Sequence, residues 1–155
     1  MTPDNISPKV EEAIRQSFAR QGLNGTLGAK LREIRPGEVK IFLRFSRRLT
    51  QQNGFLHAGV VASIADNACG YAAMSVAPIG YNPLAVEFKI NLLAPARGDH
   101  FEARARILHR GKTLTTTQAD VFAFARDGGQ QLIATMLETV ILRPVDERVA
   151  QSFAS

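Results

Sequence analysis

The segment of residues 55–79 limits the fold of this chain more than any other part of the sequence. Residues 58–77 are predicted to form a helix, which Pro78 and Gly80 end. One stripe of the helix is apolar, and the opposite stripe holds small residues and one carboxylate where a surface helix would carry several charges. The first stripe comprises Val60, Val61, Ile64, Ala65, Ala68, Ala72 and Val76, and the second comprises Ala62, Ser63, Asp66, Gly70, Ala73 and Ala77. A helix of this composition is expected to be covered on every side.

Polar residues within this segment argue against a membrane span. Burying the charge of Asp66 at the centre of a bilayer would cost several kcal/mol, and His57 and Asn67 lie in the same stretch. Residues 1–7 lack the charged and apolar regions of a signal peptide, and the single cysteine, Cys69, cannot form a disulfide within the chain. We therefore expect a cytoplasmic protein without membrane contact.

Strand-like runs occupy most of the remaining sequence. Two precede the central helix and flank a turn at residues 35–38, and four follow the helix. In the run 84–92, large apolar residues occupy every second position, which is the period of a strand. The last three runs are joined by short turns and should pair as antiparallel neighbours. The predicted strands are residues 27–34, 39–45, 84–92, 101–109, 114–126 and 132–142.

A further helix is predicted before the first strand, beginning at Pro8 with Ser7 as its N-cap and ending at residues 22–25. The 155 residues suit a single domain, 1–155, in which residues 1–26 form this helix and a linker and residues 145–155 form a tail. A curved antiparallel sheet of about six strands, wrapped around the long helix, would cover that helix. This α+β architecture is the hotdog fold, and a helix held between two subunits is compatible with the same pattern.

Charge and ligand spacing limit the expected partners. The net charge is +5, but the basic residues do not form a run and no nucleic-acid-binding motif accompanies them. A solvated basic surface is therefore expected, and a nucleic-acid partner is not. No cysteines and histidines have the spacing of a zinc site, so we expect no metal and no cofactor.

The sequence alone leaves two explanations for Asp66. Burying an unpaired charge costs several kcal/mol, so such a residue is usually paired or used in chemistry. Asp66 is therefore either a functional carboxylate or a cap of a neighbouring loop, bonded through Asn67 or a backbone N–H.

Residues 51–68 carry a resemblance to a known family. They contain Gly54-x-x-His57-Ala58-Gly59, followed in the helix by Ile64-Ala65-Asp66. This resembles the hotdog acyl-CoA thioesterases of the phenylacetate-degradation type and the related hydroxybenzoyl-CoA thioesterases, whose pattern is Gly-x-x-His-Gly-Gly and then Leu-x-Asp or Leu-x-Glu. The similarity continues through residues 86–95 and the turn at 111–112, and it covers residues 27–142.

The resemblance implies a role for each matching residue. Asp66 matches the catalytic carboxylate, as general base or nucleophile in the hydrolysis of an acyl-CoA to free acid and CoA. The backbone N–H of Ala58, where the family usually has glycine, would polarise the thioester carbonyl. Gln51 matches a position that holds the attacking water or the thioester, and His57 has an orienting role. Asn53, in the same loop, is expected to contact the substrate.

Helix geometry adds a condition to this site. The first N–H groups of a helix, here those of Ala58 and Gly59, are unpaired and suited to an oxyanion. Asp66 lies two turns further on, roughly 12 Å along the axis, which is too far for one thioester carbon to touch both. The family forms its sites between subunits, so we expect a homodimer or a dimer of dimers, with Ala58 of one subunit facing Asp66 of the other.

Coenzyme A and the remaining polar residues complete the expectations. The phosphates of CoA are expected to bind among four basic residues, Arg110, Lys112, Arg97 and Lys89. A buried structural thiol is the preferred interpretation of Cys69. His100 and His109 are taken as structural or exposed.

Two other functions remain open alternatives. Some relatives place a hydroxyl at the positions of Gly70 and Ala85, and this chain has none there, although Asn67 or Ser63 are candidate substitutes. A non-catalytic acyl-CoA-binding module is therefore one alternative. A hydroxyacyl thioester dehydratase is another, and the lack of a Pro-rich loop carrying a histidine argues against it.

Overall fold

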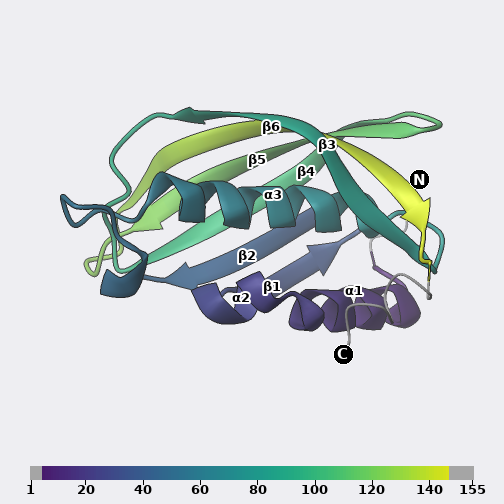
Figure 1. Cartoon of the computed structure of the whole chain (residues 1–155), viewed down its shortest axis with the longest axis horizontal. Helices are drawn as coiled ribbons and strands as arrows, with labels where there is room; N and C mark the ends of the chain where they lie inside the picture. The colour runs from purple at the N-terminus through teal and green to yellow at the C-terminus, as the bar shows by residue number, and fades with distance from the viewer. Residues whose placement is uncertain (1–4, 147–155) are drawn as a thin grey trace.

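A six-stranded antiparallel sheet curves around one long helix in the computed structural model, which describes residues 5–146 (Figure 1). The strand order is β1-β2-β4-β5-β6-β3. The elements are α1 (Pro8–Arg20), α2 (Gly22–Leu27), β1 (Lys30–Arg35), β2 (Glu38–Arg44), the 3-10 turn η1 (Arg47–Leu49), α3 (Ala58–Met74), β3 (Tyr81–Leu92), β4 (His100–Arg110), β5 (Leu114–Phe124) and β6 (Gln130–Pro144). The predicted hotdog fold is confirmed.

Alternation of side chains directs one face of the sheet onto α3. In β2, Val39, Ile41 and Leu43 are buried, whereas Glu38 and Arg44 are exposed. Gly37 has a φ of 81° in the turn between β1 and β2, a conformation that glycine adopts without a steric cost. The predicted β1–β2 hairpin and the antiparallel neighbours β4, β5 and β6 are both confirmed.

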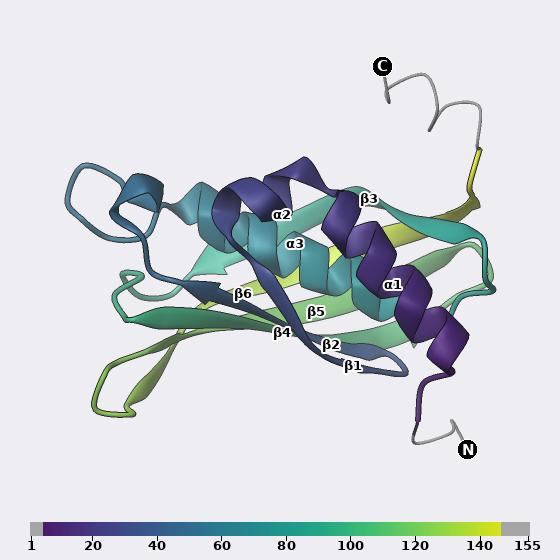
Figure 2. The ribbon, with the colours of Figure 1, turned by 90° about the horizontal axis from the view of Figure 1, so that it is seen from below.

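The N-terminal region differs from its prediction by one element. Residues 22–25, expected to end the first helix, instead begin the short helix α2, which ends at Gly28 in a left-handed conformation. Its two glycines, Gly22 and Gly25, do not prevent a helical turn when neighbouring residues pack. Seen from below in Figure 2, α1 crosses the C-terminal part of α3. The ring of Phe18 packs on that of Tyr71, and the Tyr71 hydroxyl accepts a hydrogen bond of 2.7 Å from Gln21.

The end of α3 also differs from its prediction. The helix stops at Met74 rather than at residue 77, because Ser75 forms a cap. Its hydroxyl donates to the carbonyl of Ala72 and accepts a hydrogen bond of 2.7 Å from the N–H of Gly37. The cap thus ties the end of α3 to the β1–β2 turn.

A bulge in β3 breaks the alternation predicted for residues 84–92. The register shifts between Ala85 and Glu87, so Leu84 points to the opposite face from Phe88 and Ile90. Ile90 packs against the core, but most of the apolar residues of this edge strand stay exposed.

Two further expectations concern the limits of the chain. None of the helices within residues 5–146 is long and apolar enough to cross a membrane. Of the predicted tail at residues 145–155, residues 147–155 lie outside the described part, and the division of the chain into one domain and a tail stays a prediction.

Candidate active site

The start of α3 presents one unused backbone N–H. His57 is the N-cap, and its ring Nδ1 accepts a hydrogen bond of 2.8 Å from the N–H of Gly59. The next N–H, of Val60, donates to the carbonyl of His57 at 2.9 Å. Within residues 5–146 the N–H of Ala58 has no acceptor. The expectation that Ala58 and Gly59 are both available donors is therefore wrong for Gly59, since the side chain of His57 occupies its N–H.

Hydrogen bonds hold the loop before α3 in one shape. The N–H of Gln51 donates to the carbonyl of Phe55 at 2.9 Å, and its side-chain oxygen accepts the N–H of Asn53. Gly54 has a φ of 83°, which permits the tight turn between them. The side chain of Gln51 is thereby fixed beside the start of α3, while Asn53 is exposed.

A mostly apolar cavity of about 420 Å³ lies between this loop and the segment that follows β3. Gln51 and Ala58 lie in its wall, and Asp66 does not. The other lining residues are Phe55, Leu56, Val61, Leu92, Leu93, Ala94, Pro95, Ala96 and Ile133. The cavity is large enough for part of an acyl chain or of a pantetheine arm.

Asp66 lies half-buried on the partly covered side of α3. Burial raises the pKa of its carboxyl above the usual value. No hydrogen bond or ion pair reaches its carboxylate from the described residues, and the side chain of Asn67 donates to the carbonyl of Ser63 instead. The alternative role of Asp66 as a loop cap is therefore not seen in this structure.

One stripe of α3 is only partly covered. Ala58 and Gly59 are exposed, and Ala62, Ser63, Asp66 and Gly70 are of intermediate exposure. The expectation that one sheet covers the helix on every side is wrong, because the sheet curves around only one side of α3.

A second carboxyl group, which the sequence analysis missed, lies beneath α3. Glu138 on β6 is 1% exposed, and burial raises its pKa to about 9, with further contributions from the nearby charge of Asp66. Its position could have been found, since Met136, Glu138 and Val140 occupy the inward positions of one strand. Cys69 is buried beside it, and burial raises the pKa of this thiol, which agrees with a structural role.

The four basic residues predicted to bind CoA are not gathered in one protomer. Arg110 and Lys112 lie together at the β4–β5 turn, where a side chain on Gly111 would meet the carbonyl of Leu114 at 2.7 Å. Arg97 precedes β4 and so lies at its far end, roughly 35 Å away for a strand of this length. Lys89 lies on β3. Their joint role stays a prediction.

The two remaining histidines lie outside the cavity at the start of α3. The ring of His100 stacks on that of Phe124 with 4.6 Å between centroids. His109 is exposed near the end of β4. Neither lies in the wall of the cavity, which agrees with the expectation of structural or exposed histidines.

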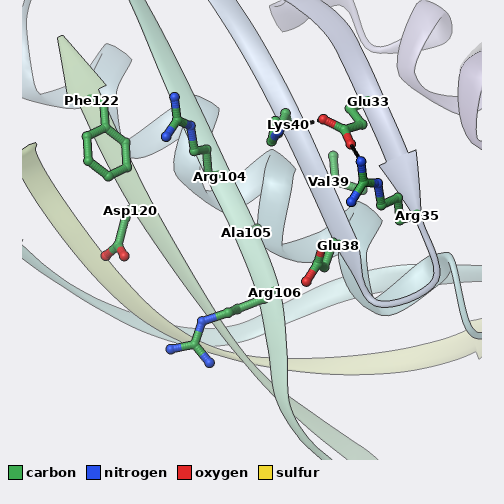
Figure 3. Close-up of a pocket in the computed structure, with 10 residues that line it drawn as sticks. All are labelled: Glu33, Arg35, Glu38, Val39, Lys40, Arg104, Ala105, Arg106, Asp120 and Phe122. Carbon is green, nitrogen blue, oxygen red and sulfur yellow. Dashed lines mark ion pairs between the residues drawn. The ribbon is translucent and has the colours of Figure 1, made fainter. Parts of the chain in front are cut away.

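A separate hollow of about 270 Å³ lies on the outer face of the sheet, away from α3 (Figure 3). Its wall contains both acids and bases, and Glu33 pairs with Lys40 and with Arg35 at 2.6 Å each. The guanidinium of Arg104 lies over the ring of Phe122. Because these groups engage one another and none belongs to the predicted site, this hollow is not the candidate active site.

Metal ligands are not grouped in the described part of the chain. No set of three histidine, cysteine, aspartate or glutamate side chains within residues 5–146 could hold an ion. The polar groups beside the cavity at the start of α3 are the N–H of Ala58 and the side chain of Gln51.

Comparisons with known proteins identify a family and a shared fold. A family model described as the thioesterase superfamily matches residues 53–128. The crystal structure of a thioesterase family protein from Silicibacter pomeroyi is 44% identical, with a TM-score of 0.85 over 88% of this chain and 99% of that one. The acyl-coenzyme A thioesterase 13 of Homo sapiens is 26% identical over 76% of this chain and 84% of its own length. The E. coli PaaI protein from the phenylacetic acid degradation operon, at 19% identity, shares the fold with a TM-score of 0.76 over 92% of this chain and 97% of that one.

Proposed function

Because the chain belongs to the thioesterase superfamily, we propose that it hydrolyses an acyl-CoA thioester to the free acid and CoA. Membership of the superfamily and the hotdog fold support a thioester hydrolase. The acyl-CoA substrate and the residues that act on it belong to the proposal.

One observation carries the proposal: Ala58, whose N–H has no acceptor within residues 5–146, lies in the wall of the 420 Å³ cavity. A thioester carbonyl placed in this cavity would accept that N–H, and the positive end of the α3 dipole would favour the developing oxyanion. His57 contributes by fixing the first turn of α3 through Gly59. Gln51 lies in the same wall and would hold the thioester or the attacking water with its side-chain amide.

Asp66 would supply the carboxylate of the reaction from a second protomer. It lies on the same helix as Ala58, roughly 12 Å away along the axis, so one carbonyl carbon cannot touch both within a single chain. A two-fold dimer that places the open stripe of α3 against its copy would bring Ala58 of one protomer to Asp66 of the other. The half-buried carboxylate would then be shielded by the partner, which strengthens its interactions.

The surface beside Asp66 suits such a second copy. β3 is an edge strand of 12 residues, and its exposed apolar side chains include Val86 at 57%, Phe88 at 48% and Leu92 at 56%. A long apolar edge that stays uncovered would promote aggregation, so natural proteins usually pair or cover it. Dimerisation through β3 and α3 would cover the edge and complete the site together. A dimer of dimers stays an expectation.

The proposed reaction needs only groups that this chain supplies. As a general base, Asp66 takes a proton from water while the water oxygen bonds to the carbonyl carbon. The N–H of Ala58 stabilises the tetrahedral oxyanion, the carbon–sulfur bond breaks, and the thiolate of CoA takes the proton held by Asp66. As a nucleophile, Asp66 instead bonds to the carbonyl carbon while the carbon–sulfur bond breaks and the thiolate of CoA leaves; water then opens the resulting anhydride to two carboxylates, and the thiolate takes one of the protons released. A single turnover in ¹⁸O water tests the second route: general-base hydrolysis places ¹⁸O in the acid, whereas an acid without ¹⁸O, together with ¹⁸O in Asp66, identifies an anhydride that water opens at the Asp66 carbonyl.

Basic residues would hold the phosphates of CoA. Arg110 and Lys112 are the strongest candidates, since the β4–β5 turn presents both to solvent together. Replacing both by glutamine should raise KM for an acyl-CoA and leave KM for the corresponding N-acetylcysteamine thioester, which lacks the phosphates, unchanged. Lys89 and Arg97 can be tested by the same pair of substrates.

The decisive experiment measures release of free thiol from short, medium, long and aryl acyl-CoAs. Turnover is expected on at least one class, and binding without turnover on all of them would favour a non-catalytic acyl-CoA-binding module. Ala58→Pro removes the N–H while keeping the helix, because proline suits this first helical position and His57 already has an extended ψ of 138°. The activity should fall by about 10²–10³-fold. Ala58→Gly retains the N–H and serves as the matched control.

Mixing two inactive variants tests the shared site. Equal amounts of Ala58→Pro and Asp66→Asn protein, unfolded and refolded together, should regain about one quarter of the wild-type activity, because half of the dimers are mixed and each mixed dimer has one complete site. Each variant refolded alone supplies the baseline. Refolded mixtures that stay at this baseline, although mass spectrometry detects mixed dimers, would contradict a site shared between protomers.

A further inference from the structure

Glu138 is the most unusual buried group of the described chain. It lies on the inner face of β6, beneath α3, with 1% of its surface exposed. Its Oε2 atom is buried and has no hydrogen-bond partner within residues 5–146. The Cys69 thiol bonds to the same carboxyl group, but burying it with one oxygen unpaired is costly, and a packed leucine or methionine would avoid that cost. A group retained at such a position therefore calls for a function.

The surroundings of Glu138 contain acids and no bases. From α3, the Asp66 carboxylate and the Cys69 thiol face it. From β5, Thr117 pairs with it in the sheet and donates its hydroxyl to the backbone carbonyl of Glu138 at 3.3 Å. From β3, Phe88 is its neighbour in register. No lysine, arginine or histidine of the described residues contributes to its protonation equilibrium.

Asp66 and Glu138 lie close enough that the charge of one disfavours ionisation of the other. Asp66 is half-buried and retains some contact with solvent, whereas Glu138 has almost none. Desolvation therefore disfavours the charged form more strongly at Glu138 than at Asp66. The negative charge of Asp66 also repels a charge on Glu138. The proton of the pair therefore resides on Glu138, and Asp66 is the ionised member.

We propose that Glu138 is a positioning residue of the active site, a neutral carboxylic acid beneath α3 that leaves Asp66 as the only charged carboxyl group of the pair. This inference rests on the proposed function of Asp66. In its neutral form Glu138 adds no negative charge close to the carbonyl carbon, where the oxyanion develops. Loss of its proton would place a second anion beneath the site, and the repulsion would raise the barrier to hydrolysis.

The pH dependence of kcat/KM tests the proposal. The acid limb should report ionisation of Asp66, and an alkaline limb should report loss of the Glu138 proton, with activity falling by about tenfold per pH unit above about pH 9. Glu138→Gln carries no ionisable proton and should keep the acid limb and the activity at pH 7 while the alkaline limb disappears. Glu87→Gln neutralises an exposed acid on the opposite face of the sheet and should keep both limbs. An alkaline limb that persists in Glu138→Gln overturns the proposal.

A second measurement remains informative if the glutamine variant does not fold or if the protein hydrolyses no thioester. In wild-type protein with ¹³C-labelled glutamate carboxyl groups, one resonance should stay protonated at neutral pH and titrate only at alkaline pH. If every glutamate carboxyl group titrates in the ordinary acid range, the proposal fails irrespective of activity. Absence of turnover in the wild type, with this resonance present, would instead count against the proposed function alone.

Discussion

The two faces of α3 have similar composition and opposite surroundings. On the sheet side, residues such as Ile64, Ala68 and Ala72 are fully buried against the strands. On the other side, Ala62 and Asp66 are only partly covered. Small and apolar residues line both faces, yet the protomer packs only the first against its own sheet.

This difference shows that a helix face with few charged residues can belong either to the core of one protomer or to a contact with a second protein. The buried face provides the core of one protomer. The open face lacks lysine and arginine and lies beside an exposed apolar edge strand, as expected of a surface that a second protein covers. Asp66 is the only carboxylate on the open face. Substitutions on each face can test the roles of the two faces separately.

The largest expected effect comes from placing the same charge on each face. Ala72→Arg buries a guanidinium against the sheet and should yield no folded protein, since an unpaired buried charge costs more than the stability of a typical domain. Ala62→Arg should fold as a monomer and lose nearly all activity. Circular dichroism and sedimentation measure both outcomes.

Ala125→Arg, at the exposed β5–β6 turn, is the control for adding an arginine and should behave as wild type. An active Ala62→Arg dimer would show that the open face of α3 is not the subunit contact.

Removal of the carboxylate from the open face should have the next largest effect. Asp66→Asn is expected to lower kcat by about 10²–10⁴-fold, the range for loss of a general base. The fold should be retained, because the pKa of Asp66 is raised by burial and its charge does not stabilise the folded state. Asp127→Asn, at an exposed turn, is the matched acid-to-amide control. Activity of Asp66→Asn within a few-fold of wild type would exclude Asp66.

The free energy of unfolding as a function of pH tests the protonation of Glu138, which lies beneath the buried face of α3. Glu138 has a folded-state pKa of about 9 against a usual value of 4.5, so the folded state holds a proton that the unfolded state has lost. The free energy of unfolding should therefore fall by about 1.4 kcal/mol per pH unit between pH 4.5 and about pH 9. The full stabilising contribution of the protonated Glu138 is present only below pH 4.5. Denaturant titrations should show that Glu138→Gln lacks this slope. An identical slope in variant and wild type would mean that Glu138 ionises normally.

The smallest expected effect concerns the α1 contact on the side of α3. Tyr71→Phe removes the hydroxyl that binds Gln21 and Ser17 and should reduce stability by about 1 kcal/mol. Activity should be unchanged, because Tyr71 lies beyond the catalytic half of α3. A loss of activity larger than the loss of stability would indicate that α1 contributes to the site.

Local patterns predicted most of the fold. Alternation in Val39, Ile41 and Leu43 identified a buried strand, and the turn at Gly37 identified the hairpin, because both depend on residues close in sequence. The bulge at Val86 and the second helix α2 were missed, since each depends on contacts with distant strands and helices rather than on local preference. The motif from Gly54 to Asp66 predicted the candidate site in the same way, and it placed Ala58 at the first helical position.

Read alone, the sequence predicts a central helix that lacks a charged face, holds a single carboxylate and follows a glycine-containing loop. The folded chain was needed to show which face of that helix stays open, that the side chain of His57 occupies the N–H of Gly59, and that Glu138 lies beneath α3 near Asp66. The reason is physical: helical spacing and turn propensity act within a few residues, whereas burial, and with it the protonation of a carboxyl group, depends on strands about 70 residues further along the chain.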